Sequence, residues 1–263
     1  MTTTIQDVID TILDQIPGGR LEETVDTVKC GDPTQAVTGI VTTFLASCDV
    51  IKKAVELGAN FIITHEPTFY DLRDDVTKFE SHAVYEAKRR LLDENGIVVW
   101  RFHDYWHRHV PDGIGIGVIR ALGWEAYVGA GDSPVFSIPE TTIGELAADM
   151  KVKLGIDTVR IVGDLEMPCR DVALMVGAPG GQWQMGMLNR DDVEVLLTGE
   201  AAEWRTPEYV RDAVAQGRKK ALIVLGHVQS EEPGMAYLVE WLRPLIPEVP
   251  IAHVPVGSAF TYV

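Results

Sequence analysis

Short apolar segments alternate with longer amphipathic segments along most of this chain. The apolar segments have the length and β-branched content of strands, and the segments between them have the 3.6-residue period of helices. Because the expected strands are apolar on both faces, they fit a largely parallel sheet that is covered by helices on both sides, and the sequence predicts an α/β fold. The expected strands span 38–44, 61–64, 97–102, 160–162, 172–176, 193–197 and 221–225, and the expected helices span 4–16, 49–57, 81–94, 113–122, a segment from Thr142, 207–216 and about 231–242.

The length is compatible with two domains. The chain has 263 residues and a mass of 29.0 kDa, which suits one large domain or two of about 130 residues each. The stretch from Tyr127 to Pro139 contains several Gly, Ser and Pro residues and is the best boundary candidate. We therefore expect two similar α/β lobes, residues 1–128 and 129–263. The boundary is approximate, and the C-terminal segment can pack on the first lobe.

The net charge and the cysteine pattern argue against several classes of protein. The 39 acidic residues outnumber the 23 basic ones and give a net charge of -16, which argues against a nucleic-acid partner because phosphate backbones bind positive surfaces. The three cysteines, Cys30, Cys48 and Cys169, form no disulfide framework and no Cys-x-x-Cys zinc motif. With no signal-peptide pattern and no long apolar run, we expect a cytoplasmic protein without a membrane partner.

Histidines recur just beyond the carboxyl ends of predicted strands. His65 follows the strand 61–64, His103 follows the strand 97–102, and His227 follows the strand 221–225. In open α/β folds the ligand site lies outside these strand ends, so the three histidines are candidates for one site.

Carboxylates accompany the histidines. Glu66 follows His65, Asp104 follows His103, and Glu231 lies four residues after His227. Histidine and carboxylate ligands together suit Zn, Fe, Mn, Co or Ni, and the identity of the metal stays open.

The remaining histidines are assigned separately. His82 and His253 are expected to have structural roles, whereas His109 and Asp104 are candidates either for ligands or for residues that orient ligands.

Three segments resemble the GTP cyclohydrolase type 2 homologue family, also called the Nif-three-like family. They are AVELGANFIITHEPTF (54–69), VEVLLTGEAAEW (193–204) and ALIVLGHVQSEE (221–232). Their order and spacing fit nearly the whole chain and resemble the short form of the family, without an inserted domain. The resemblance implies two α/β lobes with a dinuclear metal site in the cleft between them.

The same resemblance implies a set of metal ligands. One metal would take His65, His227 and Glu231, and the other would take Glu66, His107 and Glu231, with Glu231 bridging. We therefore expect two divalent metals per chain. The alternative is a single metal at His65, His227 and Glu231.

This chain departs from the family pattern at three positions. The usual His-His-Pro is His65-Glu66-Pro67, and the Asp that usually follows the middle His by four residues is replaced by His107. Because the second metal's His and Asp become Glu and His, both positions keep a residue that can bind a metal, which favours a retained site with altered geometry. Trp204 stands where the family often has a histidine.

The expected activity is metal-dependent hydrolysis of a small-molecule substrate, with a heterocyclic or amide-type ring as the expected class. His103 and Glu232 are the candidates for proton transfer because each adjoins a ligand motif. The alternative function is a non-enzymatic metal-binding chaperone or regulatory scaffold. The resemblance also implies a ring-shaped homo-oligomer, commonly a hexamer.

Overall fold

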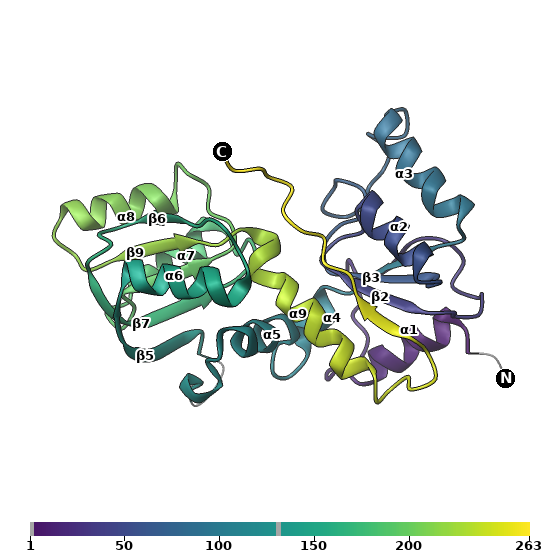
Figure 1. Cartoon of the computed structure of the whole chain (residues 1–263), viewed down its shortest axis with the longest axis horizontal. Helices are drawn as coiled ribbons and strands as arrows, with labels where there is room; N and C mark the ends of the chain where they lie inside the picture. The colour runs from purple at the N-terminus through teal and green to yellow at the C-terminus, as the bar shows by residue number, and fades with distance from the viewer. Residues whose placement is uncertain (1–2, 130–132) are drawn as a thin grey trace. The chain divides into compact units, whose positions relative to one another are not determined.

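The computed structural model describes residues 3–129 and 133–263, and its main chain forms two compact α/β units (Figure 1). Unit 1 comprises Met1–Gly117 and Gly234–Val256, and unit 2 comprises Val118–Pro233 and Gly257–Val263. The change from unit 1 to unit 2 falls within one helix, α5 (Gly113–Leu122), whereas the sequence placed the boundary after residue 128. The segment 130–132 of the predicted boundary stretch lies outside the described residues.

The described residues of unit 1 form one five-stranded sheet in the order β1-β4-β3-β2-β10. Strands β10, β2, β3 and β4 are parallel, and β1 pairs with β4 in the antiparallel direction at one edge. The sheet is therefore mixed, with a parallel centre as predicted. Its strands are β1 (Val28–Cys30), β2 (Ile40–Thr43), β3 (Phe61–Thr64), β4 (Val98–Arg101) and β10 (Ile251–His253).

Helices cover both faces of the unit 1 sheet, which explains why β2, β3 and β4 are buried at every position. Helices α2 and α3 lie on one face, and α1 and the later part of α9 lie on the other (Figure 1). The core under α2 and α3 joins Val41, Ile62 and Val99 of the strands to Ile51 and Leu92 of the helices. The helices of this unit include α1 (Ile5–Asp14), α2 (Cys48–Glu56), α3 (Ala83–Glu94) and α4 (Asp104–Arg108).

The described residues of unit 2 form a second five-stranded sheet in the order β5-β7-β8-β9-β6. The three central strands are parallel, and the two edge strands are antiparallel to their neighbours. Helices α7 and α8 pack on one face through Leu188 and Val210, and α6 lies on the opposite face (Figure 1). The elements are a 3-10 helix (Glu125–Tyr127), β5 (Val135–Thr142), α6 (Ile143–Leu154), β6 (Arg160–Val162), β7 (Pro168–Met175), α7 (Gly181–Leu188), β8 (Val195–Thr198), α8 (Thr206–Ala215) and β9 (Ala221–Val224).

The predicted α/β alternation is confirmed, and the capping box at Thr142 and Glu145 is present. The last long helix, α9 (His227–Leu242), begins one turn earlier than predicted, so Pro233 lies inside it and not in its first turn. Six elements of the described residues were not predicted: β1, α4, the 3-10 helix, α7 and β10 are short, and β5 is an edge strand whose register is irregular and which contains Pro139.

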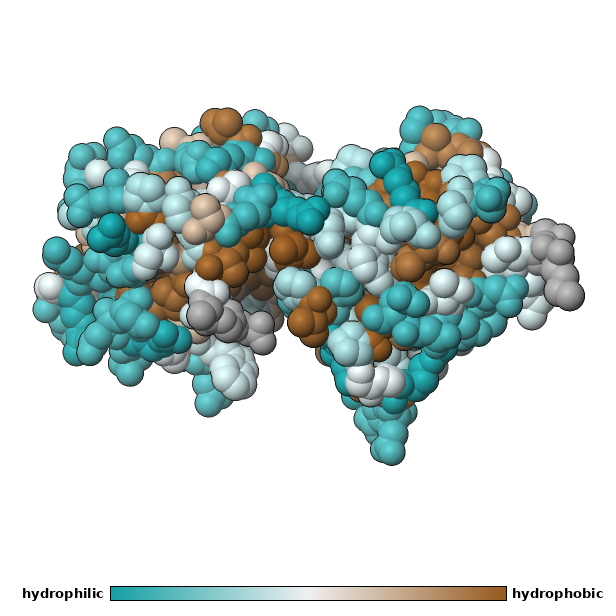
Figure 2. Space-filling model, turned by 90° about the horizontal axis from the view of Figure 1, so that it is seen from below, coloured by the Kyte–Doolittle hydropathy of each residue, from teal (hydrophilic) through white to brown (hydrophobic). Residues whose placement is uncertain are grey.

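The surface agrees with the strongly acidic composition. The face shown in Figure 2 is mostly hydrophilic in both units and is interrupted by apolar patches. Among the described residues, no helix combines the length and the hydropathy that crossing a membrane requires.

The buried ammonium of Lys88 in unit 1 donates its hydrogen bond to a neutral group and not to a carboxylate. Lys88 on α3 is 2% exposed, its ammonium donates to the Thr68 carbonyl, and it lies 5.2 Å from the Tyr70 ring centroid. A carbonyl dipole and a ring face only partly replace the lost water. Burial consequently lowers the pKa of the Lys88 ammonium from 10.5 to about 8.

We expect Lys88→Met to remove a pH dependence of stability. Between pH 8 and 10.5 the unfolded wild type holds a proton that the folded protein has released, so its free energy of unfolding rises with pH in this window. Relative to Lys88→Met, the wild type should gain about 2–3 kcal/mol from pH 8 to 10, measured by urea unfolding. Lys52→Met, which removes an exposed charge on α2, is the matched control. A constant difference between wild type and Lys88→Met across this range would contradict the prediction.

Candidate metal-binding groups

Two neighbouring parallel strands bring His65 and His103 together in unit 1. Thr64 at the end of β3 is in register with Arg101 at the end of β4; His65 is the first residue after β3, and His103 is the second residue after β4. Their rings are stacked, with centroids 4.5 Å apart and an interplanar angle of 27°. The predicted convergence at the carboxyl edge of the sheet is therefore present for this pair.

The short helix α4 adds a third imidazole. It begins just after His103 and carries His107 one turn later, with ring centroids 5.0 Å from His65 and 4.9 Å from His103. Each of the three rings offers a nitrogen, and these nitrogens all lie within 4.8 Å of one another. We call His65, His103 and His107 the three-histidine cluster.

Each ring of the three-histidine cluster is held through its Nδ1 atom. The partners are the Phe102 carbonyl oxygen for His65 at 3.4 Å, the Asp104 carboxylate for His103 at 2.9 Å and the Asp112 carboxylate for His107 at 2.7 Å. An acceptor at Nδ1 favours the tautomer in which Nδ1 carries the proton and Nε2 carries the free lone pair. This is the second-layer arrangement that orients histidine ligands of metals.

The local electrostatics favour neutral rings. Burial, together with the neighbouring His107 and His103, holds the pKa of His65 well below its ordinary value of 6.5. Burial also lowers the pKa of His103, although the hydrogen bond to Asp104 opposes this effect. Because only an unprotonated nitrogen binds a metal, both rings are in the binding form at neutral pH.

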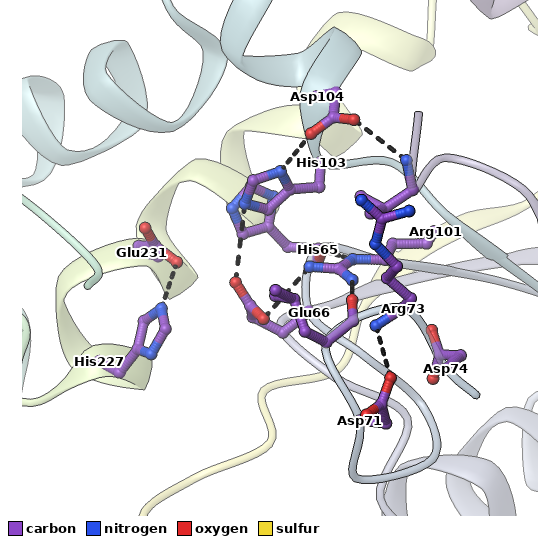
Figure 3. Close-up of polar contacts among 12 residues, drawn as sticks. His65, Glu66, Asp71, Arg73, Asp74, Arg101, His103, Asp104, His227 and Glu231 are labelled. Atoms are coloured by element: carbon purple, nitrogen blue, oxygen red, sulfur yellow. Dashed lines mark hydrogen bonds and ion pairs between the residues drawn. The ribbon is translucent and has the colours of Figure 1, made fainter. Parts of the chain in front are cut away.

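A buried arginine orients Glu66 toward the cluster (Figure 3). Arg101 is 1% exposed; its Nε donates to the His65 carbonyl at 3.0 Å, and its Nη2 donates to Glu66 Oε2 at 3.4 Å. The other carboxylate oxygen, Oε1, lies 3.8 Å from Nε2 of His103. The predicted ligand Glu66 therefore adjoins the cluster and is partly neutralised by a fixed guanidinium.

Sequence reasoning did not identify Arg101, Asp112 or Asp26 as members of this region. Arg101 was detectable as a charged residue at the end of an otherwise apolar strand. Asp26 gave no such signal, because it lies 77 residues before the His103 backbone N–H that its carboxylate accepts. Burial raises the pKa of Asp26, and hydrogen bonds from the backbone of Tyr105, His103 and Asp104 act in the opposite direction.

In unit 2 the neighbouring parallel strands β8 and β9 position a second group. Glu200 follows the end of β8, and His227 begins α9 shortly after the end of β9. Nδ1 of His227 lies 3.0 Å from Glu200 Oε1, and Nε2 lies 3.1 Å from Oε2 of Glu231, one turn along α9 (Figure 3). We call His227, Glu231 and Glu200 the His-Glu group.

In the His-Glu group, the carboxylates that face His227 outnumber the N–H groups that a neutral imidazole can donate. A neutral imidazole has a single N–H, whereas both nitrogens of His227 face carboxylates. The ring satisfies both carboxylates as an imidazolium, or with a cation bound at Nε2 and Glu231. The predicted ligands His227 and Glu231 are therefore placed together in a way that suits a metal.

Gly177 allows Glu231 its buried position. Its φ is +63°, and a Cβ atom there would collide with the Glu231 carboxylate, which is 4% exposed. The Gly177 N–H donates to Ser230 Oγ at 2.9 Å, and Ser230 in turn donates to the His227 carbonyl at 2.8 Å. The glycine is thus required both by its left-handed conformation and by the close approach of the carboxylate.

The remaining residues that the sequence analysis singled out belong to neither the three-histidine cluster nor the His-Glu group. Glu232, predicted for proton transfer, is half-buried beside Glu231 on α9. His82 occupies the N-cap position of α3, and Nδ1 of His253 lies 3.1 Å from the Thr42 carbonyl. Trp204 is 76% exposed, with the Arg205 guanidinium 5.3 Å from its ring centroid.

The donors of the three-histidine cluster fit a divalent metal, and the His-Glu group offers Nε2 of His227 beside one oxygen of Glu231. Imidazole nitrogens and carboxylate oxygens are ligands of Zn, Fe, Mn, Co and Ni. The proposed sharing of metals between His65, Glu66 and His107 on one side and His227 and Glu231 on the other stays a prediction.

The comparisons with known proteins agree with these observations. A family model described as Duf34/NIF3 (NGG1p interacting factor 3) matches residues 3–256. A "GTP cyclohydrolase 1 type 2 homolog" of Clostridium perfringens is 27% identical over 251 residues, which cover 91% of each chain.

Solved structures share the fold over the full length. A hypothetical protein of Staphylococcus aureus superposes with a TM-score of 0.78 at 19% identity and 100% coverage of both chains. A Bacillus cereus protein related to NIF3 gives a TM-score of 0.76 at 15% identity, again with 100% coverage of both chains. With a family model that matches nearly the whole chain, this protein belongs to the Duf34/NIF3 family.

Proposed function

We propose that this protein is a metal-dependent hydrolase that acts on a small heterocyclic or amide-type substrate. The observation that carries the proposal is the three-histidine cluster, whose ring nitrogens converge at the carboxyl edge of a parallel sheet while their Nδ1 atoms are held. Any buried ring needs an acceptor for its N–H, so it is the convergence of three further ring nitrogens within 4.8 Å of one another that favours a bound metal.

A divalent metal at such a site supplies Lewis acidity and lowers the pKa of a bound water, as hydrolysis requires. The chain's own groups then have distinct tasks. Asp104 and Asp112 hold the rings of His103 and His107, and Arg101 fixes the Glu66 carboxylate. Glu66 is the group of unit 1 placed beside the cluster to accept a proton from a substrate or a water; His103, predicted from the sequence for proton transfer, takes a ligand role in this proposal.

The names of relatives support the same reaction class. The Clostridium perfringens protein and a Clostridium acetobutylicum protein that is 25% identical are both named "GTP cyclohydrolase 1 type 2 homolog". Cyclohydrolysis opens a heterocyclic ring by addition of water, which suits the proposed chemistry. A small-molecule substrate, the absence of a nucleic-acid partner and a homo-oligomer, commonly a hexamer, stay predictions from the sequence.

We expect His65→Ala to lose metal from the three-histidine cluster. The protein is purified without chelators or a histidine tag, and metal per chain is measured by elemental analysis. The zinc Kd of the cluster should rise by about 100-fold or more, because removal of a direct ligand exceeds the effect of an orienting residue. His82→Ala, which removes an exposed histidine outside the cluster, is the matched control. Metal content and affinity equal to wild type in His65→Ala would refute the site.

His227→Ala tests how the two groups share metals. If each group binds its own metal, the wild type holds about two per chain and each of His65→Ala and His227→Ala loses about one. If His227 and Glu231 share metals with His65 and Glu66, as the sequence predicts, His227→Ala loses nearly all bound metal with the fold intact. Unchanged metal in His227→Ala would show that the His-Glu group binds none.

Turnover separates the enzyme from the scaffold. The metal-loaded wild type should convert GTP or a cyclic amide to a ring-opened product, followed by chromatography, and Glu66→Gln should slow the reaction by about 100-fold if Glu66 accepts the proton. A protein that binds metal in the expected ratio but converts none of these compounds would favour the alternative, a metal-binding chaperone or regulatory scaffold.

A further inference from the structure

Two segments of unit 1 that are far apart in the sequence bind each other through exchanged carboxylates. The Asp26 carboxylate accepts the backbone N–H groups of His103, Asp104 and Tyr105, at 2.8, 3.0 and 2.9 Å. In return, the Asp104 carboxylate accepts the Val25 N–H at 3.0 Å and the Thr24 hydroxyl at 2.8 Å. We call this arrangement of residues 24–26 and 103–105 the carboxylate clamp.

Asp26 supplies the N-terminal cap that α4 lacks locally. The N-cap residue, His103, makes no side-chain capping bond, and the helix is only five residues long. A helix this short does not persist without tertiary support, since nucleation outweighs the few hydrogen bonds gained. A carboxylate on the first N–H groups satisfies those donors and opposes the positive end of the helix dipole.

The other half of the clamp acts on His103 directly. Asp104 uses Oδ2 for the 24–25 segment and Oδ1 for Nδ1 of His103. Its carboxylate is thus fixed on one side by the clamp and fixes the imidazole on the other. The clamp therefore bears on two rings of the three-histidine cluster. Asp104 holds the ring of His103, and α4 carries His107.

We propose that Asp26 is a positioning residue of the three-histidine cluster, which sets the places of His103 and His107 before a metal binds. The proposal rests on the metal site proposed above. Asp26 is 6% exposed and its two oxygens are occupied by three backbone donors. It acts through α4 and Asp104 and is not itself a ligand.

The free energy that burial of the Asp26 carboxylate costs has to be offset by its hydrogen bonds. A buried carboxylate costs free energy unless its hydrogen bonds are complete, and Asp26 meets this condition only with the backbone of 103–105 in its present conformation. The same condition fixes the backbone from which His103 and His107 project. Asp26 therefore restricts the cluster to one geometry, which lowers the ordering cost when a metal binds.

The test uses Asp26→Asn in the full chain, with zinc affinity and the visible absorption spectrum of the cobalt(II) form as readouts. Asparagine keeps the size but has one acceptor oxygen and no charge, so the three N–H groups cannot all be satisfied. We expect the zinc Kd to rise by about 10- to 100-fold and the cobalt bands to change in position or intensity, because the rings around the metal are rearranged.

Controls separate positioning from general stability. Asp32→Asn removes an exposed carboxylate of the same segment whose contacts are confined to Thr34, and Val50→Ala weakens the core of unit 1 away from the clamp. Both should keep the wild-type cobalt spectrum and zinc Kd, even where Val50→Ala lowers the thermal midpoint as much as Asp26→Asn does.

The proposal is overturned if Asp26→Asn lowers the thermal midpoint but keeps the wild-type Kd and cobalt spectrum. If Asp26→Asn does not fold, Thr24→Val takes its place, because it removes a clamp contact to Asp104 and the acceptor of the Asp26 backbone N–H while keeping the Asp26 carboxylate. It should change the cobalt spectrum in the same direction and to a smaller extent, and a wild-type spectrum would overturn the proposal. Failure of the metal site itself shows separately, as unchanged metal in His65→Ala.

Discussion

The parallel register of β3 and β4 is the constraint on which the candidate site of unit 1 depends. With Thr64 opposite Arg101, both strands end at the same level, and His65, one residue beyond β3, stacks on His103, two residues beyond β4. Helices on both faces of the sheet hold this register, because a slip by one residue would exchange the two sets of closely packed side chains between the two faces. The site can therefore use residues that are 38 positions apart in the sequence without a flexible connection between them.

Closeness of the histidines does not by itself form a set of metal ligands, because each ring must also be oriented. The nearby carboxylates provide this orientation. The Nδ1 atoms of His103, His107 and His227 face Asp104, Asp112 and Glu200, so the three rings are oriented by anions that are not the expected ligands. In each case the orienting carboxylate lies on a loop or a helix start close to its histidine in space. The acidic composition of the chain thus has a local use beyond solubility.

The sequence predicted the strand ends and the acidic residues near them. It also indicated His65, His103, His107 and His227 as candidate site residues. The sequence could not show α4, because five residues carry too little periodicity to indicate a helix. It could not show Asp26 either, since a carboxylate that caps a helix almost 80 residues away leaves no local pattern. Helix α9 was expected from about residue 231, whereas it begins at His227 and tolerates the missing N–H of Pro233 inside it.

The two groups differ in the charge of their donors. The three-histidine cluster is a neutral donor set, since burial keeps the pKa values of His65 and His103 low, and Arg101 offsets the adjacent Glu66. The His-Glu group pairs one imidazole with two carboxylates. A metal keeps more of its positive charge on neutral ligands and loses more of it to carboxylates. If each group holds a metal, one on the neutral imidazoles of the three-histidine cluster would keep more Lewis acidity than one on the carboxylates of the His-Glu group, which favours the cluster in our proposal as the place where water or a substrate oxygen is activated.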